Sequence, residues 1–423
     1  MGDEYVTDIS SYGAEVPGLL RKSLYAILVV SGCASVFSLG GYSPLPVNEL
    51  LDAWLISFIC VSVWVGRIRH TMIILFLVAY LVTRVAAAVA NDSPVPDFLQ
   101  AYRWLLYLIA FVIALHRSWG PLLPMIKVMW VLISLGLVKT ILTIAILGPS
   151  QRSGLLTENN FELALYCALA AGLLSRLTGR QQVWTLLALG ALVMSSGSRS
   201  GAVEFGLLII YAVINVARAR VAVRLLLVIV VPVIVYFVSD VFAARAESGG
   251  VDRLNFLSVF LGETANWNLL DWLWGTSPIT PLSSGGCAAM EYYSSLFSST
   301  GDGTCYSVVL HAFIMRVVYD AGLFGLFLTV FVVLFSLRRS GAGVRVTWTI
   351  FAIAFANGFS VSGLNSPYVA LPIVLTICIS ANRGSVESFK PHKGVGLRGE
   401  WVRNPERFDG HDSPSSMRPE PER

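Results

Sequence analysis

The sequence contains few charged residues for its length. Of its 423 residues, 13% are charged and 55% are hydrophobic, whereas a soluble globular domain is typically about 25% charged and about 45–50% apolar. The 36 glycines, 18 prolines and 6 cysteines are too few for a collagen-like, disordered or disulfide-scaffold protein. With a mean hydropathy of +0.70, the chain is expected to be an integral membrane protein.

Motifs of several classes of site are also missing. The sequence has no Asp-x-Asp pair, which excludes the usual metal–diphosphate clamp of many sugar-nucleotide transferases. It has no zinc-type spacing of His and Cys, no glycine-rich phosphate loop and no nucleic-acid-binding motif. We therefore expect no metal, no cofactor and no nucleic acid partner.

Long apolar segments predict an all-α, polytopic membrane protein. A helix needs about 20 apolar residues to cross about 30 Å of hydrocarbon. Cutting the sequence at Pro, Gly and charge clusters gives 12 candidate spans. They lie near residues 23–40, 49–66, 70–90, 98–115, 121–148, 160–177, 181–197, 201–217, 221–239, 319–337, 345–361 and 367–382. The polar head has no clear cleavage site, so the first span is expected to be an uncleaved signal anchor.

Basic residues mark every second loop, and cytoplasmic loops are the ones enriched in Lys and Arg. Both termini are therefore predicted to be cytoplasmic, and the remaining loops to face outward. The basic loops contain Arg67, Arg69, Arg117, Arg176, Arg180, Arg218, Arg220, Arg224, Arg338, Arg339 and Arg345.

This topology predicts five regions. Residues 1–22 form a cytoplasmic segment, and 23–239 hold the first nine spans. Residues 240–318 form one large outward loop with an interfacial helix, and 319–382 hold the last three spans. Residues 383–423, rich in Pro, Ser, Gly and mixed charge, are expected to be a disordered cytoplasmic tail.

Several basic residues break the inside bias. Charges within a bilayer are costly and usually line a cavity or form pairs. We therefore expect a basic chamber that opens outward, although any single basic side chain could instead pair with an acid such as Glu162 or Glu204. Within spans these residues are Arg84, Arg103 and Lys139, and in or next to outward loops they are Arg152, Arg199, Arg245, Arg253 and Arg316.

One histidine, His311, belongs to the outer side. It follows the long loop, in a segment from Tyr306 to Asp320 that could form a helix with His311, Met315 and Val318 on one face. A neutral imidazole there could take a proton from a sugar hydroxyl near neutral pH. The alternative is an interfacial histidine that makes ordinary hydrogen bonds.

Two cysteines, Cys287 and Cys305, lie in the same outward loop. In an oxidising periplasm they would form a disulfide that closes about 18 residues and stabilises the fold by roughly 3 kcal/mol. The other four cysteines lie within predicted spans and are expected to be small core residues.

Four segments carry a pattern of motifs in a fixed order. The first is Arg152-Ser-Gly-Leu-Leu-Thr-Glu-Asn-Asn160, after the fifth span, and the second is Ser196-Gly-Ser-Arg199-Ser-Gly-Ala. The third is Arg253 with the tryptophan-rich run that ends in Trp274-Gly275. The fourth is His311-Ala312, nine residues, then Gly322-Leu-Phe-Gly325. Taken together over residues 98–370, they resemble the O-antigen ligase and O-antigen polymerase superfamily of bacterial membrane glycosyltransferases; Ala312 departs from the Asn, Ser or Gln of the ligases.

The resemblance implies a metal-independent, inverting glycosyltransferase of the GT-C type. Its donor would be a glycan on undecaprenyl diphosphate, used at the periplasmic face of the bacterial inner membrane. His311 would be the catalytic base or would orient the acceptor, and arginines would bind the diphosphate through their planar, permanently charged forks. The diphosphate candidates are Arg199, Arg253 and Arg152. Further candidates for substrate contact are Arg103, Arg84, Lys139, Asn160 and Arg316.

Three functions are open on the sequence. The leading hypothesis is a polymerase that joins lipid-linked repeats into O-antigen, capsule or exopolysaccharide, with a possible chain-length regulator as partner. The second is a ligase that transfers finished polymer to lipid A–core. The third is a transporter that flips lipid-linked glycan, although no paired halves with matching broken helices are visible.

Overall fold

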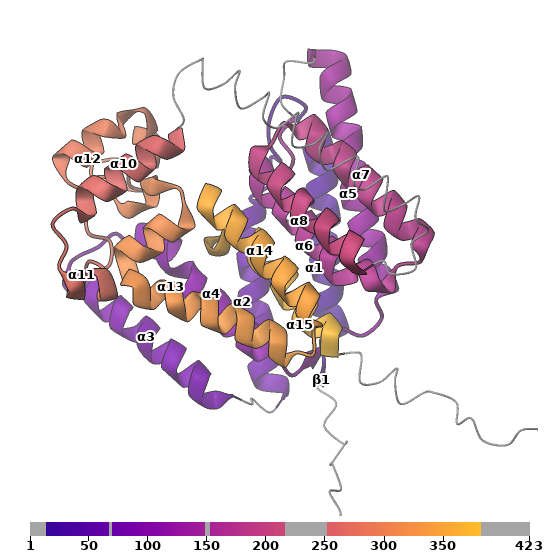
Figure 1. Ribbon diagram of the computed structural model, residues 1–423, viewed down its shortest axis with the longest axis horizontal. Helices are drawn as coiled ribbons and strands as arrows, with labels where there is room; N and C mark the ends of the chain where they lie inside the picture. Colours follow the sequence, from indigo (N-terminus) through magenta and orange to yellow (C-terminus); the bar gives the residue numbers. More distant parts are fainter. Residues whose placement is uncertain (1–13, 67–69, 149–152, 216–251, 382–423) are drawn as a thin grey trace, which may run out of the picture.

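The computed structural model describes residues 14–66, 70–148, 153–215 and 252–381. These residues fold into helices, together with one pair of two-residue strands, β1 (Ala14–Glu15) and β2 (Arg117–Ser118), which run parallel. The all-α prediction is therefore confirmed for this part of the chain (Figure 1). The span predicted at 221–239 lies outside the described residues.

The eleven other predicted spans each coincide with a helix, offset by a few residues. These helices are α1 (Gly18–Val36), α2 (Val47–Val65), α3 (Thr71–Ala90), α4 (Val95–Ala114), α5 (Leu123–Leu147), α6 (Asn159–Leu173), α7 (Gly179–Ser196), α8 (Arg199–Asn215), α13 (Phe313–Arg339), α14 (Val344–Ser360) and α15 (Pro367–Ala381).

Six of these helices, α1 to α5 and α13, are long and apolar enough to cross a membrane. Helices α6 and α15 contain only 15 residues each, less than the about 20 residues that a full crossing needs. Among the described residues the structure thus supports a membrane protein with six candidate spanning helices, and the twelve crossings expected from hydropathy are not confirmed.

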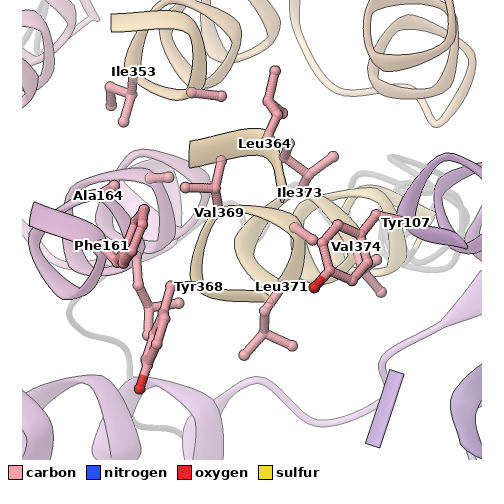
Figure 2. Close-up of a cluster of buried hydrophobic side chains, with 14 of the residues drawn as sticks. Tyr107, Phe161, Ala164, Ile353, Leu364, Tyr368, Val369, Leu371, Ile373 and Val374 are labelled. Atoms are coloured by element: carbon pink, nitrogen blue, oxygen red, sulfur yellow. The ribbon is translucent and has the colours of Figure 1, made fainter. Parts of the chain in front are cut away.

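Helix α15 forms the centre of the bundle. Every residue from Pro367 to Ser380 is buried, and the helix packs against α6, α4 and α2. The rings of Phe161 in α6 and Tyr368 in α15 are parallel, with centroids 6.5 Å apart, and both belong to the buried cluster of Figure 2. A helix that is apolar on all sides has no face suited to water, so its central position follows from its sequence.

Segments predicted to face outward meet at one end of the bundle. Contacts there join the loop before α2 to the loop before α6, the start of α8 to α6, and the loop before α13 to the loop before α15. The corresponding hydrogen bonds are Ser43 N to Leu156 O, Ser198 Oγ to Asn160 Oδ1, and Ser362 Oγ to His311 O.

Segments predicted to face the cytoplasm meet at the other end. The β1–β2 pair joins the residues before α1 to the residues after α4, and Trp119 N donates to Cys378 O near the end of α15. The rings of His70 and His116 stack 5.4 Å apart at the same end. The loops predicted to face the cytoplasm thus contact one another, as do the loops predicted to face outward.

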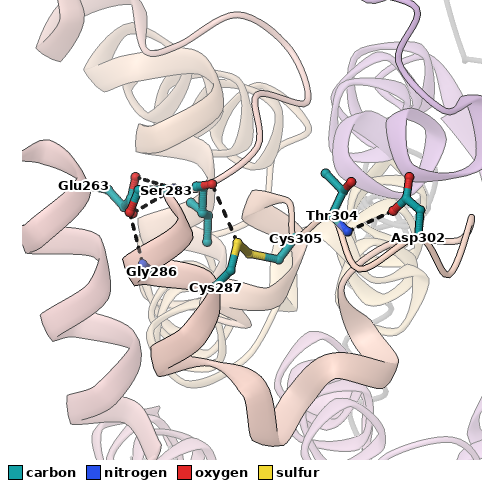
Figure 3. Close-up of a disulfide and its surroundings, with 8 residues drawn as sticks. Glu263, Ser283, Gly286, Cys287, Asp302, Thr304 and Cys305 are labelled. Carbon is teal, nitrogen blue, oxygen red and sulfur yellow. Dashed lines mark hydrogen bonds between the residues drawn. A yellow bond between two sulfur atoms is a disulfide. The ribbon is translucent and has the colours of Figure 1, made fainter.

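The described part of the long loop folds into short helices at one side of the bundle (Figure 1). They are α10 (Asp252–Thr264), α11 (Leu269–Trp274), α12 (Ser284–Ala289) and the 3₁₀ turns η2 (Glu291–Leu296) and η3 (Ser307–Leu310). Cys287 and Cys305 form a disulfide there, with Cα atoms 5.8 Å apart (Figure 3). Ser283 caps α12 and donates to Glu263 of α10, which joins the two helices.

The helix expected from Tyr306 to Asp320 is interrupted at His311. His311 ends η3 in the left-handed conformation, with φ of 53°, and α13 begins only at Phe313. His311 therefore does not share a helix face with Met315 and Val318, and the prediction on this point was wrong. The left-handed turn places His311 between two helical segments instead of on one.

Close contact between two glycines attaches α11 to α13. Gly275 and Gly322 both have positive φ, and a Cβ on Gly275 would lie 2.6 Å from the backbone nitrogen of Gly322. A Cβ on Gly322 would collide with the backbone carbonyl of Leu273. Glycine is thus needed at both positions, because a side chain is excluded by conformation and by space.

We expect Gly322→Ala to lower the free energy of unfolding by about 1–3 kcal/mol, the usual magnitude of a strained backbone position. Thermal unfolding of the purified protein in detergent measures the effect. Gly262→Ala in α10 is the matched control, because no atom lies within 4 Å of its added Cβ. Equal midpoints for the two variants would contradict the role assigned to the glycine contact.

The disulfide can be tested by peptide mapping and by its effect on stability. Unreduced peptide mapping should recover Cys287 and Cys305 as one cross-linked species, and the double Ser variant should lose roughly 3 kcal/mol of stability. Cys33 and Cys60 are exposed and not the small core residues expected from the sequence, so Cys33→Ser and Cys60→Ser serve as controls and should leave stability unchanged. Recovery of two free thiols from the loop would rule the bond out.

Candidate functional site

His311 faces a carboxylate at the end of the bundle where the outward-predicted loops meet. Its Nε2 lies 3.8 Å from Oε1 of Glu158, and both side chains are partly exposed. The backbone oxygen of His311 accepts a hydrogen bond from Ser362 Oγ at 3.0 Å, and its ring lies 6.1 Å from that of Phe256 in α10. The histidine is thus held by the elements on both sides of it while its edge stays accessible.

Glu158 is oriented by Asn160, two residues further along at the start of α6. Asn160 Nδ2 donates to Glu158 Oε1 at 3.0 Å. The Oδ1 of Asn160 accepts from the hydroxyls of Ser198 and Ser200, at 2.7 and 2.8 Å. Because hydroxyls donate to the amide oxygen, the amide nitrogen must point to the carboxylate. The two serines therefore fix the side of Asn160 that Glu158 meets.

A second asparagine holds the backbone of the first. Asn357 of α14 donates from Nδ2 both to the backbone oxygen of Asn160, at 2.9 Å, and to Glu204 Oε1, at 2.7 Å. Asn357 and Glu204 are completely buried. A polar chain thus runs from α8 through α14 and α6 to Glu158 and His311.

A polar cavity of about 240 Å³ lies on the other side of Glu158. Two loops form it, one before α2 and one before α6. Its described lining residues are Gly40, Gly41, Tyr42, Gly154, Glu158, Asn159 and Asn160, none of them cationic. Glu158 therefore belongs both to the cavity and to the contact with His311.

Comparison with known proteins adds no identification. No protein-family model and no curated protein matches the chain. The chemistry of the site has to be inferred from its own residues.

Two of the predicted basic residues are buried and do not line an open chamber. Lys139 is 1% exposed, and its Nζ donates to Ser35 Oγ at 2.8 Å and to the backbone oxygen of Gly41 at 2.7 Å. Arg316 is 3% exposed, and it donates to the backbone oxygen of Gln100 at 2.7 Å. Lys139 donates to Ser35 of α1 and to a loop carbonyl, and Arg316 donates to carbonyls of α4, so the described role of both cations is to hold neighbouring segments.

The other two basic residues of the spans have partners of their own. Arg103 forms an ion pair with Asp52 at 3.1 Å and donates from Nε to the backbone oxygen of Asn365 at 2.6 Å. The guanidinium of Arg84 lies 4.8 Å from the centre of the Tyr80 ring. Pairing was the alternative that the sequence left open, but Asp52 and Tyr80, and not Glu162 or Glu204, provide it.

Two of the three motif arginines lie in described segments, and the third does not. Arg199 begins α8 between the two serines that bind Asn160, so its backbone lies beside the cluster. Arg253 is in the first turn of α10, three residues before Phe256, whose ring contacts His311. Arg152 lies outside the described residues. The two described motif arginines thus belong to segments that converge on His311.

Glu158 and Asn357 were not singled out from the sequence. Glu158 is part of the motif that ends at Asn160, but an acidic residue before a helix is also common as a favourable charge at the helix N-terminus. Asn357 sits inside an apolar helix with no motif around it. A polar amide in such a helix was the available signal, because burial requires a partner.

Removing Asn357 tests the polar chain. Asn357→Leu leaves the buried Glu204 and the Asn160 carbonyl without this donor, so it should lower the free energy of unfolding by about 1–3 kcal/mol. Adding Glu204→Leu should recover part of that loss, since both polar partners are then gone. Asn215→Leu, at a partly exposed helix end, is the control and should change stability by less than about 0.5 kcal/mol. Strict additivity of the two buried changes in a double-mutant cycle would contradict the coupling.

Proposed function

We propose that this chain is a membrane glycosyltransferase that acts on oligosaccharide linked to undecaprenyl diphosphate and joins its repeats into a polysaccharide. The observation that carries the proposal is the pairing of His311 with Glu158 beside a polar cavity, at the end of the bundle where the outward-predicted loops meet. The motif segments around Asn160, Arg199, Arg253 and His311 converge there. This convergence in space supports the family resemblance that the order of the motifs along the chain indicated.

The proposed reaction is a single inverting displacement. The acceptor hydroxyl oxygen attacks the anomeric carbon of the donor, and its proton passes to Nε2 of His311. The bond between the anomeric carbon and the diphosphate oxygen breaks, and undecaprenyl diphosphate leaves with the electron pair. A carboxylate 3.8 Å away favours the imidazolium that results. Glu158 thus stabilises the charge that His311 acquires.

Arginine provides the electrostatic stabilisation of the leaving group in this proposal. Arg199, Arg253 and Arg152 are assigned to the diphosphate, because a guanidinium binds two phosphate oxygens at once and remains charged. Lys139 and Arg316 are not assigned to it, since both are buried and donate to backbone oxygens of the protein.

The membrane placement is part of the proposal. Basic loops direct one end of the bundle to the cytoplasm, together with both termini, and the end with His311 to the periplasm. The protein would then lie in the bacterial inner membrane with twelve crossings, including the segment at 221–239.

A purified assay tests the enzyme. Wild-type protein in lipid nanodiscs, given undecaprenyl-diphosphate-linked repeats, should form new glycosidic bonds, which mass spectrometry of the released glycan detects. His311→Ala should slow the reaction by about 10²–10⁴-fold, the usual contribution of a general base. His411→Ala, in the predicted cytoplasmic tail, is the control and should leave the rate unchanged.

Two outcomes would overturn the assignment. If the wild type forms no bond while labelled glycan crosses a bilayer containing the protein, the chain is a transporter. If His311→Ala and the wild type polymerise at equal rates, His311 is not the base.

A gene deletion separates polymerase from ligase. Without a polymerase, cells should carry single repeats on the lipid carrier. Without a ligase, long chains should accumulate on it instead. We expect single repeats.

A further inference from the structure

The cavity beside Glu158 has walls that are built to keep their shape. Ser43 N donates to Leu156 O at 2.7 Å and so joins the loop before α2 to the loop before α6. The buried Lys139 strengthens this junction, because its Nζ binds the backbone oxygens of Gly41 and Leu155, at 2.7 and 3.4 Å. A buried cation thus holds both walls from behind without entering the cavity.

The ring of Tyr42 lies close to the backbone of the opposite wall. A Cβ on Gly154 would be 2.7 Å from Cδ1 of Tyr42 and 2.7 Å from the backbone oxygen of Gly41. The absence of a side chain at Gly154 therefore lets the aromatic ring approach the backbone. Tyr42 itself remains 48% exposed, so part of its ring is available to a ligand.

The chemistry of the lining selects the type of ligand. A carboxylate, two amides, a phenol and glycine backbone surround the space. The described lining residues are neutral or acidic, a composition that favours a ligand with hydroxyl groups over a phosphate. Hydroxyl groups, in contrast, can donate to the carboxylate, and an aromatic face can pack against a sugar ring.

The size limits the ligand further. Pockets for drug-sized molecules usually measure about 300–1,000 Å³, and this cavity measures about 240 Å³. The space therefore fits one sugar ring better than an oligosaccharide.

We propose that this cavity binds the terminal sugar of the acceptor glycan, with a ring hydroxyl donating to Glu158 and the ring packing against Tyr42. Glu158 also faces His311 Nε2 at 3.8 Å, so the carboxylate that would bind the sugar adjoins the proposed base. The acceptor role rests on the proposed function, whereas sugar binding in the cavity does not. The diphosphate of the donor binds elsewhere, at the arginines.

Binding is tested on the purified full chain by saturation-transfer NMR. The probes are methyl glycosides of glucose, galactose, mannose, rhamnose and N-acetylglucosamine, offered one at a time. At least one should receive saturation from the wild type. Glu158→Gln keeps the shape but removes the charge, and it should weaken binding about tenfold, as expected for a lost hydrogen bond to a charged group. Tyr42→Ala should also weaken it.

Two controls separate this site from general adhesion. Tyr292→Ala removes a tyrosine that is 90% exposed in η2 and should leave the signal unchanged. Inorganic pyrophosphate should not compete with the glycoside. The proposal falls if no glycoside binds, if Glu158→Gln binds as well as the wild type, or if pyrophosphate displaces the sugar. Because Glu158→Gln is isosteric, it decides the matter even if Tyr42→Ala fails to fold.

The acceptor role has a separate readout. In the polymerisation assay Glu158→Gln should raise the KM for the acceptor about tenfold and leave the KM for the donor unchanged. Bond formation with a wild-type acceptor KM in Glu158→Gln would remove the acceptor assignment and leave the enzyme intact. Glycoside binding that depends on Glu158, in a protein that forms no glycosidic bond, would keep the sugar site and remove the enzyme.

Discussion

The structure depends on one constraint, which is the cost of burying a polar group without a hydrogen-bond partner. In a bundle surrounded by hydrocarbon, an unpaired donor or acceptor costs several kcal/mol and water cannot compensate it. Lys139 and Arg316 meet this constraint by donating to backbone oxygens, and Asn357 meets it by bridging Asn160 and Glu204. Each solution fixes a neighbouring segment at the same end of the bundle. The position of His311 and of the cavity follows from these solutions.

The polar chain from Glu204 to His311 contains buried residues that fix the structure and partly exposed residues that remain accessible. Asn357 and Glu204 are fully buried, and Asn357 joins Glu204 to the backbone oxygen of Asn160 in α6. Glu158 and His311 are partly exposed and remain accessible. Rigid buried groups thus determine the direction of the exposed ones, which is the arrangement expected of a preorganised site. Substrate would then meet side chains whose orientation is already set.

Hydropathy predicted the helices well because the length of an apolar segment is a local property. Apolar composition alone does not identify a crossing, because α6 and α15 are short and are apolar for a different reason, namely that other helices surround them. The break at His311 and the turn at Gly322 could not be read from the sequence. The second depends on Gly275, which lies 47 positions earlier and packs against Gly322 only in the folded chain. Likewise, a lysine within a span indicates a buried charge, but not which carbonyl oxygens accept from it.

The central position of α15 has a consequence for biogenesis. A ribosome releases α2, α4 and α6 long before it releases α15, so the three helices that pack around α15 reach the membrane without the helix that fills the space between them. The core of the bundle therefore stays incomplete until α15 is inserted. Before that step the earlier helices form an open intermediate, and chains that stall there should be recognised by membrane quality control as unassembled.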